Sequence, residues 1–163
     1  MSESIRAKLD AAGDYLTAHP DEARYTDSVA TARVVEGLRV RVEGPGGAVV
    51  ETDMPESVGG TNVFQSSGWL FRAALASCVA TLIAMRAAQE QLDASHIVVE
   101  VDSQSDDRGI LGLDEVTPAG PLSISVRVSG AGDDIRPVVE WAFAHCPVQD
   151  AAARAIPITL HLT

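Results

Sequence analysis

The sequence predicts an α+β fold in which antiparallel strands surround one long central helix. Two patterns support this prediction. Short segments alternate apolar and polar residues and are separated by glycine-rich turns, as in hairpins of half-buried strands. Between two groups of such segments, residues 68–91 form a helical pattern that is apolar on nearly every side. A helix of this kind is enclosed on several sides.

The first group of strands is expected to form a hairpin around the turn Gly44-Pro45-Gly46-Gly47. Before the turn, Leu38, Val40 and Val42 alternate strictly with charged residues, which is typical of a strand with one buried face. The turn lacks the Lys and Ser/Thr of a phosphate-binding loop, so a hairpin is the better interpretation. The expected strands cover residues 28–35, 38–43 and 48–53.

The central helix carries an apolar stripe at spacings of three and four residues. The residues of this stripe are Phe71, Ala74, Leu75, Cys78, Leu82 and Met85. Between Ala73 and Ala84 its only polar residues are Ser77 and Thr81, and both can hydrogen-bond to carbonyls of their own helix. A few short strands would not cover all sides of such a helix, so we expect a second copy of the chain to complete its shelter.

The second half of the chain is expected to alternate strands and helices. A helix starts at Asp133-Asp134, tolerates Pro137 in its first turn and runs to about His145. A break at Cys146-Pro147 then precedes a shorter helix. The remaining expected elements are strands at 97–101, 122–129 and 157–163, and the short helix at 148–155.

A further helix is expected over residues 4–18, where Ile5, Leu9 and Leu16 share one face. His19-Pro20 ends it, because the residue before a proline avoids helical geometry. We therefore divide the chain into an N-terminal helical extension, residues 1–27, and a main domain, residues 28–163.

The composition argues against several classes of partner. A formal net charge of −11 disfavours nucleic acids and anionic membranes, because both require clustered Lys and Arg. We find no apolar run of the ~18 residues that a membrane span needs, and no signal peptide. We therefore expect a cytoplasmic protein without a membrane partner.

The two cysteines differ in their local setting. Cys78 lies within the apolar helix, where burial alone would raise its pKa and make it inert. Cys146 precedes Pro147, a residue favoured at the first helical position, so Cys146 is expected near a helix N-cap that would stabilise a thiolate. They are 68 residues apart, so a redox pair would have to form through the fold. From the residues alone, a redox couple and two inert core residues both remain possible, whereas a zinc site is disfavoured.

Three segments of the chain resemble the OsmC/Ohr family. Ala73-Ala74-Leu75-Ala76-Ser77-Cys78 resembles the "AALASC" helix of that family, and His145-Cys146-Pro147-Val148 resembles its "HCPV" segment. The stretch from Met54-Pro55 to Gly59-Gly60-Thr61-Asn62 resembles its P…GG…TN loop. The resemblance covers about residues 28–163 and leaves the helix at 4–18 outside.

The resemblance implies an OsmC-like fold, an intertwined homodimer and a peroxidase that defends against oxidative stress. Cys78 would attack an organic hydroperoxide and become a sulfenic acid, and Cys146 would be the resolving thiol that closes a disulfide. An external dithiol would then reduce the disulfide. No metal and no organic cofactor would be required.

The sequence departs from the family at the residues that activate the peroxidatic cysteine. The family's peroxidases carry a glutamate ten residues before that cysteine, where this chain has Gly68. They also carry an arginine after a Gly-Gly pair in the first hairpin, for which Arg39 is the nearest candidate. The strand alternation alone makes Arg39 an ordinary solvated residue. Arg72 lies on a different helix face from Cys78, and either Glu51 or Glu56 could replace the missing carboxylate.

These departures leave a second hypothesis open. The chain could be a non-peroxidatic module that keeps the fold and binds a small apolar ligand. Gly68 leaves more room than a glutamate would, and Trp69 beside it could line an apolar pocket.

Overall fold

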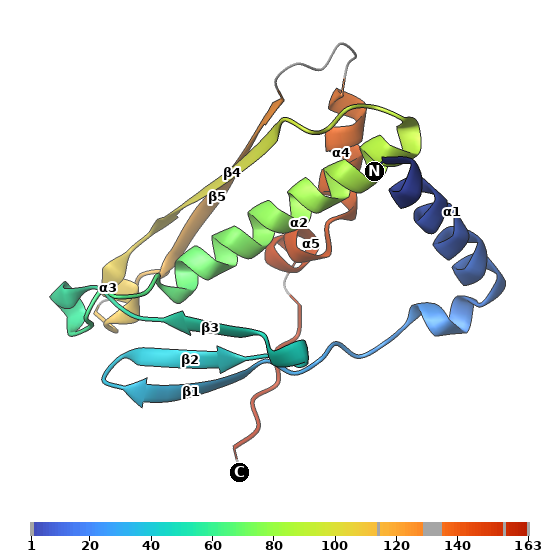
Figure 1. Ribbon diagram of the computed structural model, residues 1–163. Coiled ribbons are helices and arrows are strands. Elements are labelled where there is room, and N and C mark those ends of the chain that lie inside the picture. The colour runs from blue at the N-terminus through green and yellow to red at the C-terminus, as the bar shows by residue number, and fades with distance from the viewer. Residues whose placement is uncertain (1, 114, 129–134, 155, 163) are drawn as a thin grey trace. The chain divides into compact units, whose positions relative to one another are not determined.

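The computed structural model describes residues 2–113, 115–128, 135–154 and 156–162. The chain divides into two compact units. One consists of Asp14–Phe71, and the other combines Met1–Gly13 with Arg72–Thr163. Figure 1 labels the helices and strands of both units.

The unit Asp14–Phe71 contains a three-stranded antiparallel sheet in the order β1-β2-β3. Its register pairs Val34 with Val40, and Val42 with Val50. The sequence prediction of a hairpin is confirmed, although the first strand begins three residues later than expected. The strands are β1 (Thr31–Glu36), β2 (Arg39–Glu43) and β3 (Val49–Thr52).

The hairpin turn explains the glycines between β2 and β3. Gly46 and Gly47 have φ angles of 65° and 79°, in the left-handed region that residues with a Cβ adopt only under strain. On the apolar face of this sheet, Val34 is 71% exposed and Val50 is 38% exposed. Within this unit, the described residues therefore leave this part of the sheet at least partly uncovered.

The loop after β3 is held together by a buried carboxylate. Asp53 is only 2% exposed and accepts hydrogen bonds from the backbone N–H groups of Met54 (2.8 Å), Thr61 (3.0 Å) and Val63 (3.4 Å). The Thr61 hydroxyl donates a further bond of 2.5 Å to the same side chain. A Cβ at Gly60 would lie 1.8 Å from the Met54 carbonyl oxygen, so only glycine fits there. The P…GG…TN pattern is thus, at least in part, a structural motif.

The second unit combines helices with a two-stranded sheet. Strands β4 and β5 pair antiparallel, with Val99 opposite Val126. The loop between them contains a short helix, and both strands are longer than the sequence predicted. The elements are α2 (Ser67–Glu90), whose first five residues belong to the other unit, β4 (Ile97–Ser105), α3 (Asp107–Ile110), β5 (Ala119–Val128), α4 (Arg136–His145) and α5 (Pro147–Ala153).

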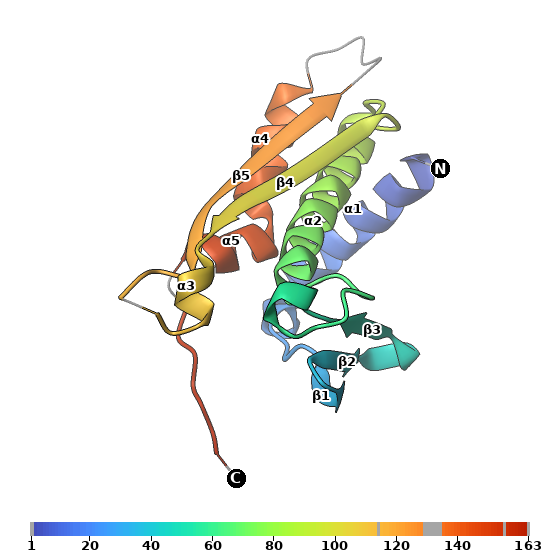
Figure 2. The ribbon, with the colours of Figure 1, turned by 90° about the vertical axis from the view of Figure 1, so that its left-hand side faces the viewer.

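The core of this unit lies between α2, α4 and the sheet (Figure 2). Each helix contributes a row at a spacing of four residues. The fully buried row of α2 consists of Leu75, Val79, Ile83 and Ala87, and that of α4 consists of Val138, Ala142 and then Cys146. Alternate residues of the two strands pack onto these rows, namely Ile97, Val99, Val101, Ile124 and Val126. Burial of such side chains contributes roughly 1.5–3 kcal/mol each relative to exposure.

The exposed side of α2 corrects two sequence expectations. Phe71 and Ala74, which the predicted stripe included, are exposed, because the helix turns Leu75 and the residues four and eight positions later toward α4. The opposite row is also open within this chain. It consists of the small residues Ala74, Ser77, Thr81 and Ala84. Within its own unit, the described residues therefore do not enclose the central helix on all sides.

Helix α2 also corrects the expectation about membrane spans. By length and composition alone, its mean hydropathy of 1.6 over an 18-residue window would allow it to cross a membrane. The core helix of a water-soluble protein can pass the same criterion. Here one side of the helix packs against α4 and the β4–β5 sheet, which fits a core helix better.

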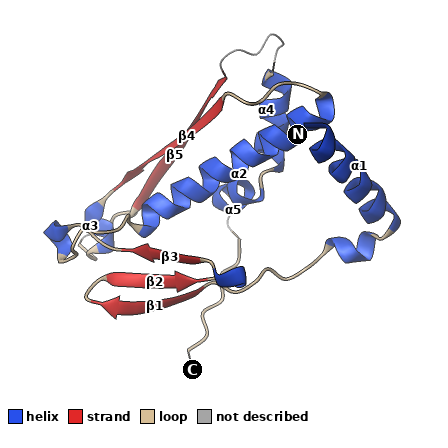
Figure 3. Cartoon of the chain, viewed as in Figure 1, coloured by secondary structure: helices blue, strands red, loops and turns tan. Residues whose placement is uncertain are grey.

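The C-terminal segment is not the strand that its alternating pattern predicted. Residues 156–162 have no strand partner among the described residues and are drawn as a loop in Figure 3. Ile158, Leu160 and Leu162 are 91%, 80% and 88% exposed. Alternation describes which side chains would face one way, but a strand also needs a sheet edge to pair with.

Helices α1 and α4 confirm two other expectations from the sequence. The N-terminal helix is present as α1 (Ser2–Ala18), and a short 3-10 turn, Pro20–Ala23, follows His19. Helix α4 carries Pro137 in its first turn, as expected. The predicted helix start at Asp133-Asp134 lies outside the described residues, as do Ser129, Ala155 and Thr163.

We predict that the Asp53 loop makes the protein sensitive to acid. The Thr61 hydroxyl and the three N–H groups lower the pKa of Asp53 from 3.8 to about 2. A lowered carboxyl pKa contributes stability that is present above pH 3.8 and is lost as the pH falls toward 2. Thr61→Val removes the largest cause, so it should reduce stability at pH 7 and flatten this part of the pH dependence. Urea unfolding from pH 7 to pH 2.5 measures both effects. If the free energy of unfolding changes equally with pH in wild type and variant, Asp53 is not the source of this pH dependence.

Candidate functional site

Cys146 lies at the break between α4 and α5. It is completely buried and forms the N-cap of α5, as the sequence predicted. Its sulfur accepts a hydrogen bond from the backbone N–H of Gln149 at 3.4 Å, and its carbonyl accepts one from Asp150 at 2.9 Å. The break occurs here because Pro147 lacks an N–H and disfavours helical geometry at Cys146, whose ψ is 113°.

Cys78 lies on α2 and packs against the same core cluster. Its thiol is within hydrogen-bonding reach of Cys146, and both thiols are free. Cys78 is only half-buried, whereas Cys146 has no exposed surface. The fold therefore brings together two cysteines that the sequence separates by 68 residues, which sequence analysis could not show.

The surroundings of Cys78 favour its protonated form. Burial is the largest factor that raises the pKa of the Cys78 thiol, and the hydrogen bond with Cys146 raises it further. The Val148 N–H acts in the opposite direction. No arginine or lysine within the described residues contributes to this balance. A reactive thiolate at Cys78 would need a nearby cation to stabilise its charge.

An apolar cavity of about 320 Å³ is connected to the cysteine pair through Gln149, which lines it and donates its backbone N–H to the Cys146 sulfur, although neither cysteine is among its lining residues. Leu75, one turn before Cys78, forms part of its wall, and so does Phe143, three residues before Cys146. The described residues that line it are Leu75, Leu122, Ile124, Phe143, Gln149, Ala152 and Ala153. Its position and lining suit the alkyl or aryl part of a small apolar molecule.

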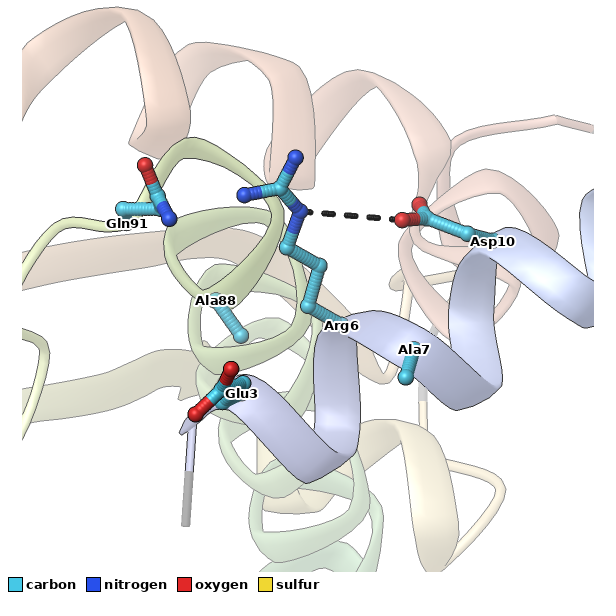
Figure 4. A pocket seen from close by; sticks show the side chains of 6 residues that line it. All are labelled: Glu3, Arg6, Ala7, Asp10, Ala88 and Gln91. Atoms are coloured by element: carbon cyan, nitrogen blue, oxygen red, sulfur yellow. Dashed lines mark ion pairs between the residues drawn. The ribbon is translucent and has the colours of Figure 1, made fainter.

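A larger cavity, of about 520 Å³, lies between the start of α1 and the end of α2. Figure 4 shows its polar lining, in which Arg6 pairs with Asp10 at 3.6 Å. None of its lining residues carries a thiol, and Ala88 is ten residues, or roughly 15 Å along the helix axis, from Cys78. This cavity has the larger volume, but the smaller cavity is the candidate site because one of its lining residues, Gln149, contacts the Cys146 sulfur.

Arg39 is more constrained than an ordinary solvated strand residue. Its guanidinium is 2.7 Å from Glu51 on the neighbouring strand β3 and lies over the Phe64 ring, 5.0 Å from the ring centroid. Its Nε is buried and has no hydrogen-bond partner among the described residues. Of the two carboxylates considered from the sequence, Glu51 pairs with Arg39, whereas Glu56 is exposed. Arg39 and Cys78 belong to different units.

The ion pair of Arg39 is one end of a charged ladder on the polar face of the sheet. Arg41 joins Glu51 at 3.6 Å to Glu43 at 3.0 Å, and Glu43 in turn binds Arg33 at 2.6 Å. The ladder fixes Glu51, whose side chain is the least exposed of the group. Arg39 is therefore held from one side by charge and from the other by an aromatic ring.

The remaining candidates on α2 have structural roles. Arg72 donates a 3.0 Å hydrogen bond to the Ser103 hydroxyl on β4, so its guanidinium holds helix and sheet together. Gly68 lies in the first turn of α2, and its neighbour Trp69 is nearly half exposed. Neither Gly68 nor Trp69 lines the cavity beside the cysteines, so that cavity does not depend on them.

Sequence analysis missed two features next to Cys146. The His145 ring stacks on Trp141 with centroids 4.2 Å apart, and its Nδ1 lies 2.7 Å from the Trp141 carbonyl, to which it donates a hydrogen bond. This contact closes the last turn of α4 and turns the ring back along the helix. The second feature is Gln149, which lines the cavity. The Trp-His spacing of four was visible in the sequence, whereas the cavity was not.

The family comparison agrees with this arrangement of helices, strands and cysteines. A family model described as "OsmC-like protein" matches residues 60–161, more than half of the chain. The chain belongs to the OsmC-like protein family. The match contains both cysteines of the site and begins at the Gly60 of the Asp53 loop. No curated protein sequence matches this chain.

Solved structures show that this OsmC-like chain has the OsmC-like α+β fold. An organic hydroperoxide resistance protein OsmC from Legionella pneumophila is 20% identical, with a TM-score of 0.61 over 79% of this chain and 90% of the other. A Psychrobacter arcticus protein named for osmotic stress and detoxification is 19% identical (TM-score 0.63; 78% and 89%). An OsmC-like protein of unknown function from Vibrio cholerae is 10% identical (0.60; 77% and 93%). At these identities the likeness establishes the fold alone.

We predict that Cys146 controls the acidity of Cys78. Cys146→Ala removes the hydrogen bond and the charge that raise the Cys78 pKa, so the pKa should fall toward 9.0 while burial keeps it above that value. Iodoacetamide alkylation of Cys78 between pH 6 and pH 11, followed by peptide mass spectrometry, measures the midpoint. Ser77→Ala, on the exposed side of α2, should leave the midpoint unchanged. If the midpoint does not shift in Cys146→Ala, Cys146 does not raise the pKa of Cys78 and the prediction is wrong.

Proposed function

We propose that this protein is a thiol-dependent peroxidase that reduces organic hydroperoxides and serves in oxidative-stress defence. The observation that supports it most is the contact between Cys78 and Cys146 beside an apolar cavity. An apolar wall favours alkyl or aryl hydroperoxides over hydrogen peroxide, which has no group to bury. The Legionella pneumophila protein of the same fold is named for organic hydroperoxide resistance.

The unequal burial of the two cysteines supports the roles proposed for them. Cys78 is the more accessible, so the peroxide meets it first and its thiolate attacks the terminal oxygen of the O–O bond. The alkoxide leaves, takes up a proton and becomes an alcohol, while Cys78 becomes a sulfenic acid. The Cys146 thiol then attacks the Cys78 sulfur, which forms the disulfide and releases water. A dithiol reductant restores both thiols, and no metal or organic cofactor takes part.

Arg39 is the proposed cation that stabilises the Cys78 thiolate. Its Nε–H is a buried donor without a partner in the described chain, and such a donor is free for an anion. Glu51 and Phe64 already restrict its guanidinium, so little conformational entropy would be lost when it engages a thiolate. In this proposal Glu51 replaces the carboxylate that Gly68 lacks.

A second copy of the chain is the proposed partner. Three groups of apolar or small residues are exposed: Val34 and Val50 of the β1–β3 sheet, the small-residue row of α2, and the C-terminal residues Ile158, Leu160 and Leu162. Their exposure would be unfavourable in an isolated chain, and an intertwined homodimer would bury all three. We further propose that the protein is cytoplasmic, where dithiol reductants are present.

The alternative function is binding of a small apolar ligand without peroxidase activity. The raised pKa of Cys78, with no cation among its causes, favours it. In that case the cavity would bind a ligand, and the two thiols would remain a buried pair. An apolar molecule that co-purifies in native mass spectrometry, together with absent peroxide turnover, would support this alternative.

We predict turnover of cumene hydroperoxide by the reduced protein with a dithiol. Cys78→Ser should lower turnover roughly a hundredfold or more, because it removes the nucleophile. Cys146→Ser should still reduce about one peroxide per Cys78 and then stop, because the disulfide cannot form. Peroxide loss and sulfenic acid trapping measure the two steps. Equal rates for wild type and Cys78→Ser would exclude the peroxidase.

We predict that Arg39→Gln lowers the rate of Cys78 oxidation about tenfold or more, because the thiolate loses its cation. Arg33→Gln is the matched control, since Arg33 occupies the far end of the same ladder and is more exposed. Stopped-flow measurement of the single-turnover rate at pH 7 compares the two. Similar rates in both variants would rule out Arg39 as the activating cation.

We predict a stable dimer at low micromolar concentration, with twice the 17.1 kDa mass of one chain. Burial of the three exposed groups should couple dissociation to unfolding, so that the melting temperature rises with protein concentration. Sedimentation velocity and thermal melts at several concentrations provide the test. A folded species of 17.1 kDa at these concentrations would show that one chain needs no partner.

A further inference from the structure

The cavity beside the cysteines has one polar side chain among its described lining residues. Six of them are Leu, Ile, Phe or Ala, and the seventh is Gln149. A predominantly apolar pocket with a single polar group is a common design for binding a molecule that is apolar except at one point. A hydroperoxide is such a molecule, because only its two oxygen atoms are polar.

Gln149 lies immediately next to the sulfur atoms. Its backbone N–H donates to the Cys146 sulfur at 3.4 Å, and that sulfur is in hydrogen-bonding contact with Cys78. Gln149 therefore belongs both to the cavity lining and to the immediate surroundings of the Cys146 sulfur. It is half-buried and has no hydrogen-bond partner among the described residues.

The side chain is not needed for the local fold. The N-terminus of α5 is capped by Cys146 through the backbone of Gln149, and any residue other than proline supplies that N–H. Alanine or leucine would suit the first turn of a helix at least as well as glutamine. A polar group that neither caps the helix nor pairs with a neighbour is available for a ligand.

We infer that the Gln149 carboxamide is the polar contact that binds the peroxide oxygens and directs them at Cys78. This inference rests on the proposed peroxidase function. The apolar part of the substrate lies along Leu122, Ile124 and Phe143, and the carboxamide NH₂ donates a hydrogen bond to the oxygen attached to carbon. The other oxygen, which carries the hydrogen, then faces the Cys78 sulfur.

The reaction that results is balanced without further reagents. The Cys78 thiolate forms a bond to the terminal oxygen, the O–O bond breaks, and its electron pair leaves on the oxygen attached to carbon. The carboxamide stabilises this developing alkoxide by its hydrogen bond, and solvent supplies the proton that makes the alcohol. Gln149 thus does not transfer a proton, and its contribution should be felt in the rate of the chemical step.

Gln149→Leu tests this role, because leucine keeps the size of the side chain and removes the donor. With cumene hydroperoxide and a dithiol, we expect kcat to fall roughly tenfold to a hundredfold while KM stays within about twofold. Gln149→Glu has nearly the same shape but no NH₂, so it should also lose the rate. Leu122→Ala is the comparison variant, because it shortens the apolar lining and keeps the carboxamide, so it should raise KM more than it lowers kcat.

A second readout separates this contact from a structural effect. In a Cys146→Ser background, the rate of Cys78 sulfenic acid formation should fall in Gln149→Leu by the same factor as kcat, with an unchanged melting temperature. If the wild type turns over peroxide and Gln149→Leu matches it within twofold, the inference is overturned and the peroxidase stands. If wild-type Cys78 does not react with the peroxide at all, the proposed function fails, and the role of Gln149 fails with it.

Discussion

The site depends on one backbone constraint, the inability of the chain to continue as a helix at Pro147. Because Pro147 has no N–H, α4 ends at His145, and Cys146 adopts an extended conformation that starts α5. Cys146 thereby continues the buried row of α4 and also caps the next helix. Its contact with Cys78, the cavity wall and the orientation of Gln149 all follow from this break. A continuous helix would retain the buried row but would form no second helix to border the cavity.

The same packing that brings the cysteines together opposes their chemistry. Four-residue rows on α2 and α4 bury Cys146 and half-bury Cys78, and burial raises the pKa of Cys78. A peroxidase needs the thiolate, so the free energy of ionisation has to be recovered through a nearby positive charge. The Arg39–Glu51 pair on the sheet has the geometry of a held cation, with a spare donor at Nε. Activation would then depend on how this sheet and the cysteine pair are assembled.

Local patterns in the sequence predicted most of the fold, and they failed where a structure depends on distant partners. The hairpin turn, the α2 helix and the Cys146 N-cap follow from the properties of Gly, Pro and apolar spacing, and all three are confirmed. The C-terminal strand was wrong because alternation says nothing about an available sheet edge. The buried row of α2 was predicted around Cys78, but spacing alone could not choose among faces that are all apolar. The cavity and Gln149 could not be predicted, because they require the placement of four elements.

The difference in burial between the two sulfurs has a consequence for the return half of the cycle. With Cys146 fully enclosed, an incoming dithiol would reach the disulfide only at the sulfur of Cys78. The mixed disulfide would then form on α2, and Cys146 would be the leaving group. A leaving thiolate departs faster when it is stabilised, and the Gln149 N–H already points at this sulfur. The N-terminus of α5 would thus assist the reduction of the disulfide rather than the attack on the peroxide. In the proposed cycle, oxidant and reductant would both react at the Cys78 sulfur, and the buried Cys146 sulfur would only form and release the disulfide bond.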